Sequence, residues 1–347
     1  MTGRINTAVL GATGYAGAEL VRLLGHHPRI EKLVLLRRDG AINGSYPAEL
    51  FPDCPNGNGY DFHPLDWGLL NRQGVQLLFL ATPHEVSRSV VPQAIAQGLR
   101  VIDLSGAWRL KQERHRSVYG FRDEDSLTAS DLARKAVYGL PELNGDRIAD
   151  ATLVANPGCY ATSIILALAP LLKAGRINCE HGIISDSKSG VSGAGKEPTE
   201  RTHFVSVADN LSAYSVFNHR HCGEIVEQLS LSSSQLIFTP HLLPIPRGIL
   251  STIYVRLQCA TKESEIEDCY CGFYGGKRWV RVFATPRLPQ IRFALHTNYC
   301  DLGFCLSDDG CRLVIVSCVD NLLKGAAGQA AQNMNLMHGW EEEEGLQ

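Results

Sequence analysis

The strongest constraint on the fold is an alternation of short apolar runs with amphipathic segments in the first third of the chain. Two of these segments, residues 16–24 and 86–97, have the apolar spacing of a helix, although Pro92 must be tolerated inside the second one or kink it. Apolar runs that alternate with helices are typical of strands in a parallel sheet that is buried on both faces. The pattern therefore predicts an α/β domain with a Rossmann-type doubly wound parallel sheet. We expect its strands at residues 7–10, 33–36, 75–81 and 101–104.

A different pattern begins after a change of composition near residues 153–157. A helical pattern at 160–173 precedes a short apolar run at 182–186 and a glycine-rich segment, 188–196, which we expect to be a loop. Alternating apolar residues then predict longer strands in an antiparallel or mixed sheet, and hence a second domain of α+β type. These strands are expected at residues 236–238, 250–257, 279–283, 291–295 and 313–319.

The last segment, residues 321–337, is rich in Ala and Gln and is expected to be a helix that packs back on the first domain. We therefore predict one domain made of residues 1–156 with 321–347, and a second made of residues 157–320. A length of 347 residues is compatible with this division into two domains.

Composition excludes several classes of function. The net charge is −3 and no basic stripe stands out, so there is no electrostatic case for nucleic-acid binding. The longest apolar runs, such as residues 163–172, are shorter than the roughly 20 residues that cross a bilayer. The eleven cysteines show neither a repeated CxxC nor a Cys/His zinc spacing, and no signal-peptide pattern precedes the first strand. We expect a reduced, cytoplasmic protein without a metal site or a membrane partner.

A glycine pattern joins the first predicted strand to the first predicted helix. Gly11, Gly14 and Gly17 form a GxxGxxG variant of the dinucleotide fingerprint, and Thr13 and Tyr15 lie within it. The first glycine allows a tight turn, the second lets the backbone approach a pyrophosphate, and the third permits close packing of helix on strand. The helix N-terminus then faces the anion. This segment predicts a nucleotide site, and the alternative is a turn with a purely structural role.

Two arginines indicate which nucleotide binds. An acidic residue normally follows the second strand where it binds the ribose 2′-hydroxyl of NAD, but here Arg37 and Arg38 follow it and favour a 2′-phosphate, hence NADP. Asp39 leaves NAD open as the alternative. Pro83 and His84 follow the third strand, where loops contact the cofactor.

A candidate nucleophile follows the change of composition. Pro157 and Gly158 interrupt the chain, so Cys159 is expected at the N-terminus of the next helix, where the partial positive charge stabilises a thiolate. The alternative is a cysteine that is only a small buried hydrophobe. Farther on, His219 and His221 flank Arg220; a zinc site is conceivable there, but one histidine acting as acid/base beside a cysteine fits this spacing better.

Other segments have the composition of an anion site. Residues 187–196 offer backbone amides, hydroxyls and two lysines, which suits a phosphate or carboxylate, although a flexible surface loop is the alternative. Arg109 follows the fourth strand, and Arg247 lies in a proline-rich turn that either supplies another cation or has only an architectural role.

In this order, the motifs resemble the N-acetyl-γ-glutamyl-phosphate reductase family of arginine biosynthesis, which is related to aspartate-semialdehyde dehydrogenase. The resemblance spans nearly the whole chain. The matching stretches are GATGYAG at 11–17, ATPH at 81–84, DLSGAWRL at 103–110, YGLPEL at 138–143, ANPGCYAT at 155–162, KSGVSGAGK at 188–196, HRH at 219–221, PHLLPIPRGILST at 240–252 and DNLLKGAAGQAAQNMN at 320–335.

The resemblance implies roles for single residues. Cys159 corresponds to the catalytic nucleophile and a histidine of the HRH motif to the acid/base, for which we prefer His221. The resemblance also implies that Asn321 contacts the nicotinamide side of the cofactor. It further implies substrate contacts from Arg109, Ser189, Gly190, Ser192 and His219.

Three positions depart from the pattern of the family. Ala107 replaces the usual Asp, Glu85 follows Pro83-His84, and the glycine-rich loop ends in Lys196, which keeps a charge but lacks the bidentate fork of Arg. These departures bear on substrate preference more than on the reaction.

The residues and the resemblance lead to one expected activity. We predict an NADPH-dependent reductase that converts an acyl phosphate, N-acetyl-glutamyl 5-phosphate, to the semialdehyde through a thioester on Cys159. The first domain would bind NADP, and the second would carry the catalytic residues and form a homo-oligomer, either a dimer or a tetramer. The alternatives are a reductase of aspartyl phosphate or of a carrier-linked glutamyl phosphate, and an NADP-binding relative without turnover.

Overall fold

The structure is a computed structural model that describes residues 3–37, 61–123 and 125–346. The chain divides into two compact units. The first comprises the residues up to Pro157 together with those from Ala326 onward, and the second comprises Gly158–Gly325. Arg38 and Asp39 lie outside the described residues.

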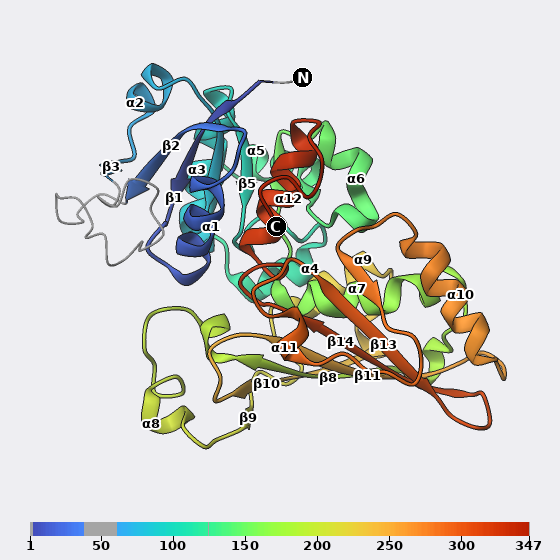
Figure 1. Cartoon of the computed structure of the whole chain (residues 1–347). Coiled ribbons are helices and arrows are strands. Elements are labelled where there is room, and N and C mark those ends of the chain that lie inside the picture. The colour runs from blue at the N-terminus through green and yellow to red at the C-terminus, as the bar shows by residue number, and fades with distance from the viewer. Residues whose placement is uncertain (1–2, 38–60, 124, 347) are drawn as a thin grey trace. The chain divides into compact units, whose positions relative to one another are not determined.

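The described part of the first unit is built on a parallel sheet of seven strands in the order β3-β2-β1-β4-β5-β7-β6 (Figure 1). Its central strands are buried along most of their length, as their continuous apolar sequences predict. The doubly wound fold expected from the sequence is therefore confirmed. The strands are β1 Ile5–Leu10, β2 Ile30–Arg37, β3 Phe62–Pro64, β4 Val75–Leu80, β5 Arg100–Asp103, β6 Val137–Tyr138 and β7 Leu153–Ala155.

Helices cover this sheet. α12, the last helix of the chain, packs against α1, α6 and β5. Pro92 lies inside α3, so the helix accommodates it. The helices of this unit are α1 Tyr15–Gly25, α2 Trp67–Arg72, α3 His84–Ala96, α4 Glu113–Arg116, α5 Ser126–Lys135, α6 Pro141–Ala149 and α12 Ala327–Met337.

The second unit has a mixed sheet in the order β12-β13-β14-β11-β8-β10-β9 (Figure 1). β10 pairs with β8, and β12 with β13, in parallel, whereas the other neighbours are antiparallel. The mixed sheet expected for this part of the chain is confirmed. Its strands are β8 Ile183–Gly190, β9 Ser212–Ala213, β10 Leu236–Leu243, β11 Ile249–Arg256, β12 Val280–Val282, β13 Cys300–Leu306 and β14 Arg312–Val319.

One helix, α7 (Cys159–Lys173), forms the centre of this second unit. Its residues from Tyr160 to Leu171 are all buried, and it packs against β11 and β14. Hydroxyl groups fasten it to the sheet: Ser163 Oγ is hydrogen-bonded to Ser251 Oγ at 3.0 Å and to Ser317 Oγ at 2.9 Å. These buried hydroxyls satisfy one another, so the contact fixes the position of α7 without leaving them unpaired. The other helices of the unit are α8 Phe204–Val207, α9 His221–Gln228, α10 Glu263–Tyr274 and α11 Ile291–Ala294.

Two local predictions were wrong or incomplete. Residues 291–295, predicted as a strand, contain the helix α11, since a short apolar run does not distinguish helix from strand. The expected loop at 188–196 starts as the end of β8 and continues as a 3₁₀ turn at Val191–Ala194. The strands β3, β6, β7, β9 and β13 were not predicted.

Within the described residues, the structure contains no helix long and apolar enough to span a membrane.

Candidate functional site

The glycines of the first βα turn have the geometry that the dinucleotide fingerprint requires. Gly11 has φ +93°, and a Cβ on it would lie 2.4 Å from the carbonyl oxygen of Ala81. A Cβ on Gly17 would lie 2.1 Å from the carbonyl oxygen of Gly11. Gly14 precedes α1 in an extended conformation and provides no side-chain cap. Thr13 and Tyr15 flank Gly14, and the uncapped start of α1 fits a bound pyrophosphate.

Other predicted cofactor residues lie at the ends of strands or the starts of helices in the same unit. Arg37 is the last residue of β2 and is half-buried. Pro83 precedes α3, and His84 begins it. The His84 ring packs edge-on against Tyr119, with ring centroids 5.1 Å apart, and its Nε2 lies 3.1 Å from Glu85 Oε1. His84 is thus held in one orientation at the carboxyl end of β4.

Arg109 is buried and bonds to the backbone. Its Nε donates to the carbonyl oxygen of Asn156 at 2.7 Å, and its Nη2 to that of Leu104 at 2.6 Å. These bonds join the segments that follow β5 and β7. A substrate contact by Arg109 stays a prediction.

Cys159 lies where the sequence predicted it, as the first residue of α7. Gly158 is the N-cap residue, in an extended conformation, and the Cys159 side chain is half-buried. A Cβ on Gly325 would lie 2.7 Å from the Cβ of Cys159, so the backbone of Gly325 packs directly against the cysteine. The helix N-terminus favours the thiolate form of such a cysteine.

His221 lies against the turn that precedes this cysteine. It begins α9 and is buried. A Cβ on Gly158 would lie 2.3 Å from His221 Nε2, so only a glycine leaves room for the ring. The structure therefore brings the predicted nucleophile and the preferred acid/base together.

His219 has a different environment. Its ring centroid is 4.7 Å from that of His221 and 5.6 Å from those of Tyr160 and Tyr214, all edge-on. Its Nδ1 accepts a hydrogen bond from the backbone N–H of His221 at 3.1 Å. Burial, and secondarily the charge of Arg220, lowers the pKa of His219 to about 4. His219 is therefore neutral near pH 7.

The sequence analysis assigned no role to Glu224, which follows His221 by three residues. Glu224 is fully buried on α9. Its Oε2 accepts a hydrogen bond from the backbone N–H of Gly158 at 3.0 Å, and its Oε1 lies 3.8 Å from His221 Nε2. The only signal in the sequence was an acid three residues after a histidine, a spacing that places both on one face of a helix.

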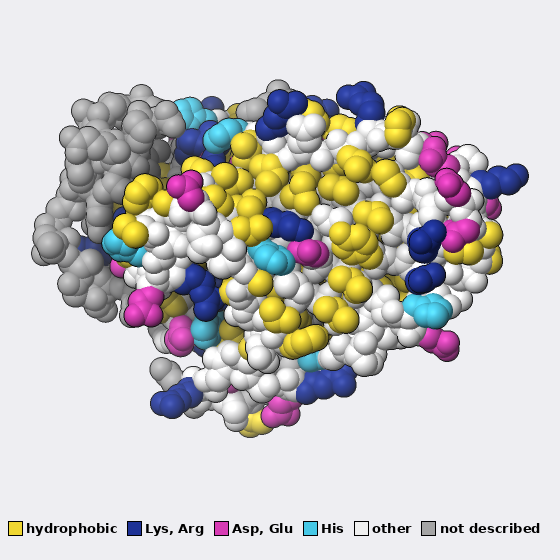
Figure 2. All heavy atoms as spheres, turned by 90° about the horizontal axis from the view of Figure 1, so that it is seen from below, with side chains coloured by type: hydrophobic (Ala, Val, Ile, Leu, Met, Phe, Trp, Pro, Cys, Tyr) yellow, Lys and Arg dark blue, Asp and Glu magenta, His cyan; other side chains and the backbone are white. Residues whose placement is uncertain are grey.

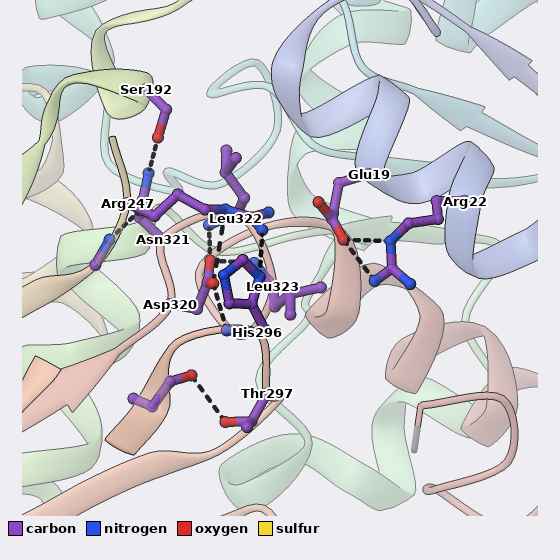
Figure 3. Close-up of polar contacts among 12 residues, drawn as sticks. Glu19, Arg22, Ser192, Arg247, His296, Thr297, Asp320, Asn321, Leu322 and Leu323 are labelled. Atoms are coloured by element: carbon purple, nitrogen blue, oxygen red, sulfur yellow. Dashed lines mark hydrogen bonds and ion pairs between the residues drawn. The ribbon is translucent and has the colours of Figure 1, made fainter. Parts of the chain in front are cut away.

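The glycine-rich segment after β8 is tied to other loops of the second unit. Ser189 Oγ donates to the carbonyl oxygen of Gly190 at 3.0 Å, and Ser192 Oγ accepts from Asn321 Nδ2 at 2.9 Å (Figure 3). Asn321 Oδ1 in turn accepts from the backbone N–H of Gly248 at 2.7 Å. Asn321 thus joins two loops, and its expected contact with the nicotinamide stays a prediction.

Charged groups border these loops. Arg247 Nε lies 3.7 Å from Asp320 Oδ2, and Arg247 Nη1 lies 3.0 Å from His296 Nδ1 (Figure 3). Asp320 Oδ1 accepts the backbone N–H groups of Leu322 and Leu323. Arg247 is therefore part of a fixed polar network.

A cavity of about 730 Å³ opens in the second unit beside Tyr214. The guanidinium of Arg201 lies over the Tyr214 ring, 5.6 Å from its centroid. The Tyr214 hydroxyl donates to that of Tyr160 at 3.5 Å, and Tyr160 follows Cys159 in the chain. Its lining combines polar and apolar groups and includes both Arg201 and Glu200. The residues that line it include Thr199, Arg201, Thr202, Ser206, Asn210 and Tyr214.

Two family models match the chain. The model described as semialdehyde dehydrogenase, NAD binding domain, matches residues 6–151. The model described as semialdehyde dehydrogenase, dimerisation domain, matches residues 159–321.

Solved structures have the same fold. Aspartate semialdehyde dehydrogenase II of Vibrio cholerae, solved in complex with ASA, has a TM-score of 0.72 at 19% identity over 97% of this chain and 99% of that one. The aspartate semialdehyde dehydrogenase of Candida albicans, solved with NADP, has a TM-score of 0.67 at 15% identity, again over 97% and 99%.

Sequence relatives are closer. A protein of Desulforapulum autotrophicum is 43% identical and one of Alkaliphilus metalliredigens 45% identical, each over 99% of this chain and 98% of the relative. A Methanocaldococcus jannaschii protein is 42% identical over 98% and 97%. All three are N-acetyl-gamma-glutamyl-phosphate reductases. The resemblance stated from the motifs is thereby confirmed, and the chain belongs to the N-acetyl-gamma-glutamyl-phosphate reductase family.

Proposed function

We propose that this protein reduces N-acetyl-glutamyl 5-phosphate to N-acetyl-glutamate 5-semialdehyde and phosphate, a step of arginine biosynthesis. The observation that carries the proposal is the placement of Cys159 at the start of α7, with His221 packed on the glycine before it. The identity of about 40–45% to reductases with this name over nearly the whole chain supports the substrate.

The side chains divide the reaction into two steps. The Cys159 thiolate attacks the acyl carbonyl and forms a thioester, and the bond to phosphate breaks. His221, as the imidazolium, donates a proton to the departing phosphate oxygen and regains one from solvent. NADPH, when bound by the first unit, would supply the hydride that reduces the thioester carbonyl. The carbon–sulfur bond then breaks, the aldehyde is released, and Cys159 returns as the thiolate.

His221 suits proton transfer better than His219 does. A histidine whose pKa is about 4 carries almost no proton near neutrality, so His219 has little to donate there. Its Nδ1 is also engaged by the backbone of His221. We assign His219 to orienting His221 and the substrate.

The first unit is proposed to bind NADPH. The glycine turn and the start of α1 would hold the pyrophosphate, because their backbone has the close approaches that this task requires. Arg37, the last residue of β2, would recognise the 2′-phosphate.

A homo-oligomer is proposed to form through the mixed sheet of the second unit. α7 covers one face of this sheet, whereas Ile184, Ile237 and Tyr254 on the other face are 40–43% exposed. Figure 2 shows hydrophobic side chains gathered on the side of the molecule seen from below, where Figure 1 places these strands. Contiguous apolar surface of this kind marks an interaction site, and the match to a dimerisation-domain model favours a second copy of the chain as the partner.

Substitution Cys159→Ser is expected to abolish reduction of N-acetyl-glutamyl 5-phosphate and to leave NADPH binding intact, because a serine alkoxide is not stabilised at this pH. Turnover is measured from NADPH oxidation, and binding from the nucleotide's fluorescence. Cys271→Ser, at an exposed position of α10, is the control and should keep wild-type turnover. A tenfold loss of rate corresponds to an increase of only about 1.4 kcal/mol in the activation free energy. A Cys159→Ser variant that keeps more than about a tenth of the wild-type rate would therefore contradict a covalent step. Faster turnover of aspartyl phosphate would instead reassign the substrate.

Substitution His221→Asn is expected to remove the ionisation near neutrality from the pH profile of kcat/KM, whereas His219→Asn should lower the rate and keep that ionisation. The reason is that the pKa of His219 already lies near 4. Profiles of both variants between pH 5 and 9 test the assignment. It reverses if His219→Asn alone removes the ionisation.

The wild type is expected to prefer NADPH to NADH, and Arg37→Ala to lose much of that preference. A guanidinium–phosphate contact contributes roughly 1.5–3 kcal/mol, or about ten- to over a hundred-fold in kcat/KM. Steady-state kinetics with both cofactors measure this, and Arg72→Ala, at an exposed position of the same unit, is the control. Equal use of NADH by the wild type would refute the preference.

Substitution Tyr254→Lys is expected to dissociate the oligomer, because a charge would replace apolar contact area at the centre of the exposed sheet face. Sedimentation equilibrium of the wild type and the variant measures the mass. Leu127→Lys is the control, since Leu127 is 83% exposed on α5 of the other unit. A wild type that sediments as a monomer at micromolar concentration would end this proposal.

A further inference from the structure

A fully buried carboxylate lies beside both the turn that carries the nucleophile and the acid/base. We propose that Glu224 is a positioning residue, which holds His221 as the imidazolium and fixes the turn that places Cys159. The inference rests on the proposed function, in which a protonated His221 acts beside a cysteine nucleophile.

The first part of the argument is geometric. His221 and Glu224 are three residues apart on α9, so both face α7. One carboxylate oxygen accepts the N–H of Gly158 at 3.0 Å, and the other lies 3.8 Å from His221 Nε2. A single side chain therefore contacts the residue before the nucleophile and lies next to the acid/base.

The second part is electrostatic. Glu224 has no exposed surface, and a carboxylate removed from water is costly unless hydrogen bonds and an opposite charge compensate it. The N–H of Gly158 supplies one hydrogen bond. An imidazolium at His221 supplies the opposite charge, and a charge at such a distance favours the protonated form of a histidine.

The other groups around His221 do not provide that negative charge before the thiol ionises. His219, which precedes α9, is neutral near pH 7, since its pKa is about 4. Tyr160 on α7 packs edge-on against the His221 ring at 6.1 Å, and burial raises its pKa, so it stays neutral as well. Arg220 is an exposed cation, and Cys159 begins α7. Among these groups, Glu224 is the one that favours the imidazolium in the free enzyme.

The arrangement also has a consequence for Cys159. With Glu224 ionised and His221 protonated, thiolate formation at Cys159 adds a second negative charge beside the same Gly158 turn. Removing the carboxylate charge would leave the imidazolium unsupported, and His221 would lose its proton at lower pH. The alkaline limit of the reaction would then move toward neutrality.

The test is Glu224→Gln, which keeps the volume and the hydrogen-bond acceptor for Gly158 but removes the charge. In the full-length enzyme without substrate, the Cε1–H signal of His221 is followed by NMR in ¹³C-histidine-labelled protein, with His221→Asn to identify it. The midpoint of its titration is expected to fall by about one to three pH units in Glu224→Gln. The alkaline limb of kcat/KM for the reductase reaction should fall with it.

Two further variants serve as controls. Glu227→Gln makes the same substitution one turn farther along α9. It should leave the midpoint of the His221 titration unchanged. Glu224→Asp keeps the charge and should restore most of the midpoint, whatever it costs in rate. If Glu224 served only for packing, Glu224→Gln would lower the rate but would change neither the midpoint of the His221 titration nor the alkaline limb of kcat/KM.

Equal midpoints in the wild type and a folded Glu224→Gln would overturn the proposal. If Glu224→Gln does not fold, the wild type itself decides, because a His221 midpoint at or below the ordinary value of about 6.5 also overturns it. The NMR titration needs no substrate, so it is independent of the proposed function. Absence of reductase activity with a raised His221 midpoint would refute the function and leave the role of Glu224 standing.

Discussion

The candidate active site depends on the close approach of the His221 ring to the α-carbon of Gly158. A Cβ at that position would lie 2.3 Å from His221 Nε2, well inside van der Waals contact. On the other side of the cysteine, Gly325 has a similar constraint, since its Cβ would lie 2.7 Å from that of Cys159. Gly158 and Gly325, which have no side chains, thus lie next to the nucleophile. Their lack of a Cβ lets neighbouring groups come closer to Cys159 than a larger residue would allow.

Such a close arrangement requires a rigid support, and α7 provides one. The helix is buried over most of its length, and the hydroxyls of Ser163, Ser251 and Ser317 hydrogen-bond to one another beneath it. Tyr270 on α10 adds a hydrogen bond from its hydroxyl to the carbonyl oxygen of Ala167 at 2.7 Å. These directional contacts define the position of the helix along its axis, which apolar packing alone would specify less well. The position of Cys159 follows from them.

The sequence predicted the four central strands of the parallel sheet, β1, β2, β4 and β5, because strands buried on both faces are apolar throughout and need no knowledge of their neighbours. It failed where tertiary contacts decide the structure. β13 contains Asp301 and Gly303, which interrupt its apolar pattern. Asp301 is fully buried and pairs with Arg281 from the neighbouring strand at 2.6 Å. The segment Ile291–Ala294 has a strand-like composition but forms one helical turn against β14.

In the candidate site too, residues set by local sequence could be predicted, and residues set by tertiary contacts could not. Cys159 could be found from the sequence, because proline and glycine before an apolar helix identify a helix N-terminus. The importance of Glu224 could not be found, because its main partner, the N–H of Gly158, is 66 residues away in the chain.

The motif residues Arg109 and Asn321 look like ligand contacts in the sequence, yet in the structure they donate to or accept from backbone groups of their own units. Arg109 bonds to two carbonyl oxygens that follow parallel strands, and Asn321 joins the loops of Ser192 and Gly248. A polar side chain that spends its hydrogen bonds on the backbone determines the shape of a loop, and the loop's own amides then face the ligand. For an anionic substrate this is an effective use of such residues, because backbone N–H groups fixed in advance need no reorganisation when the charge arrives. Arg109 and Asn321 therefore help to fix the shapes of the loops around them, and their direct contacts with substrate and cofactor stay predictions.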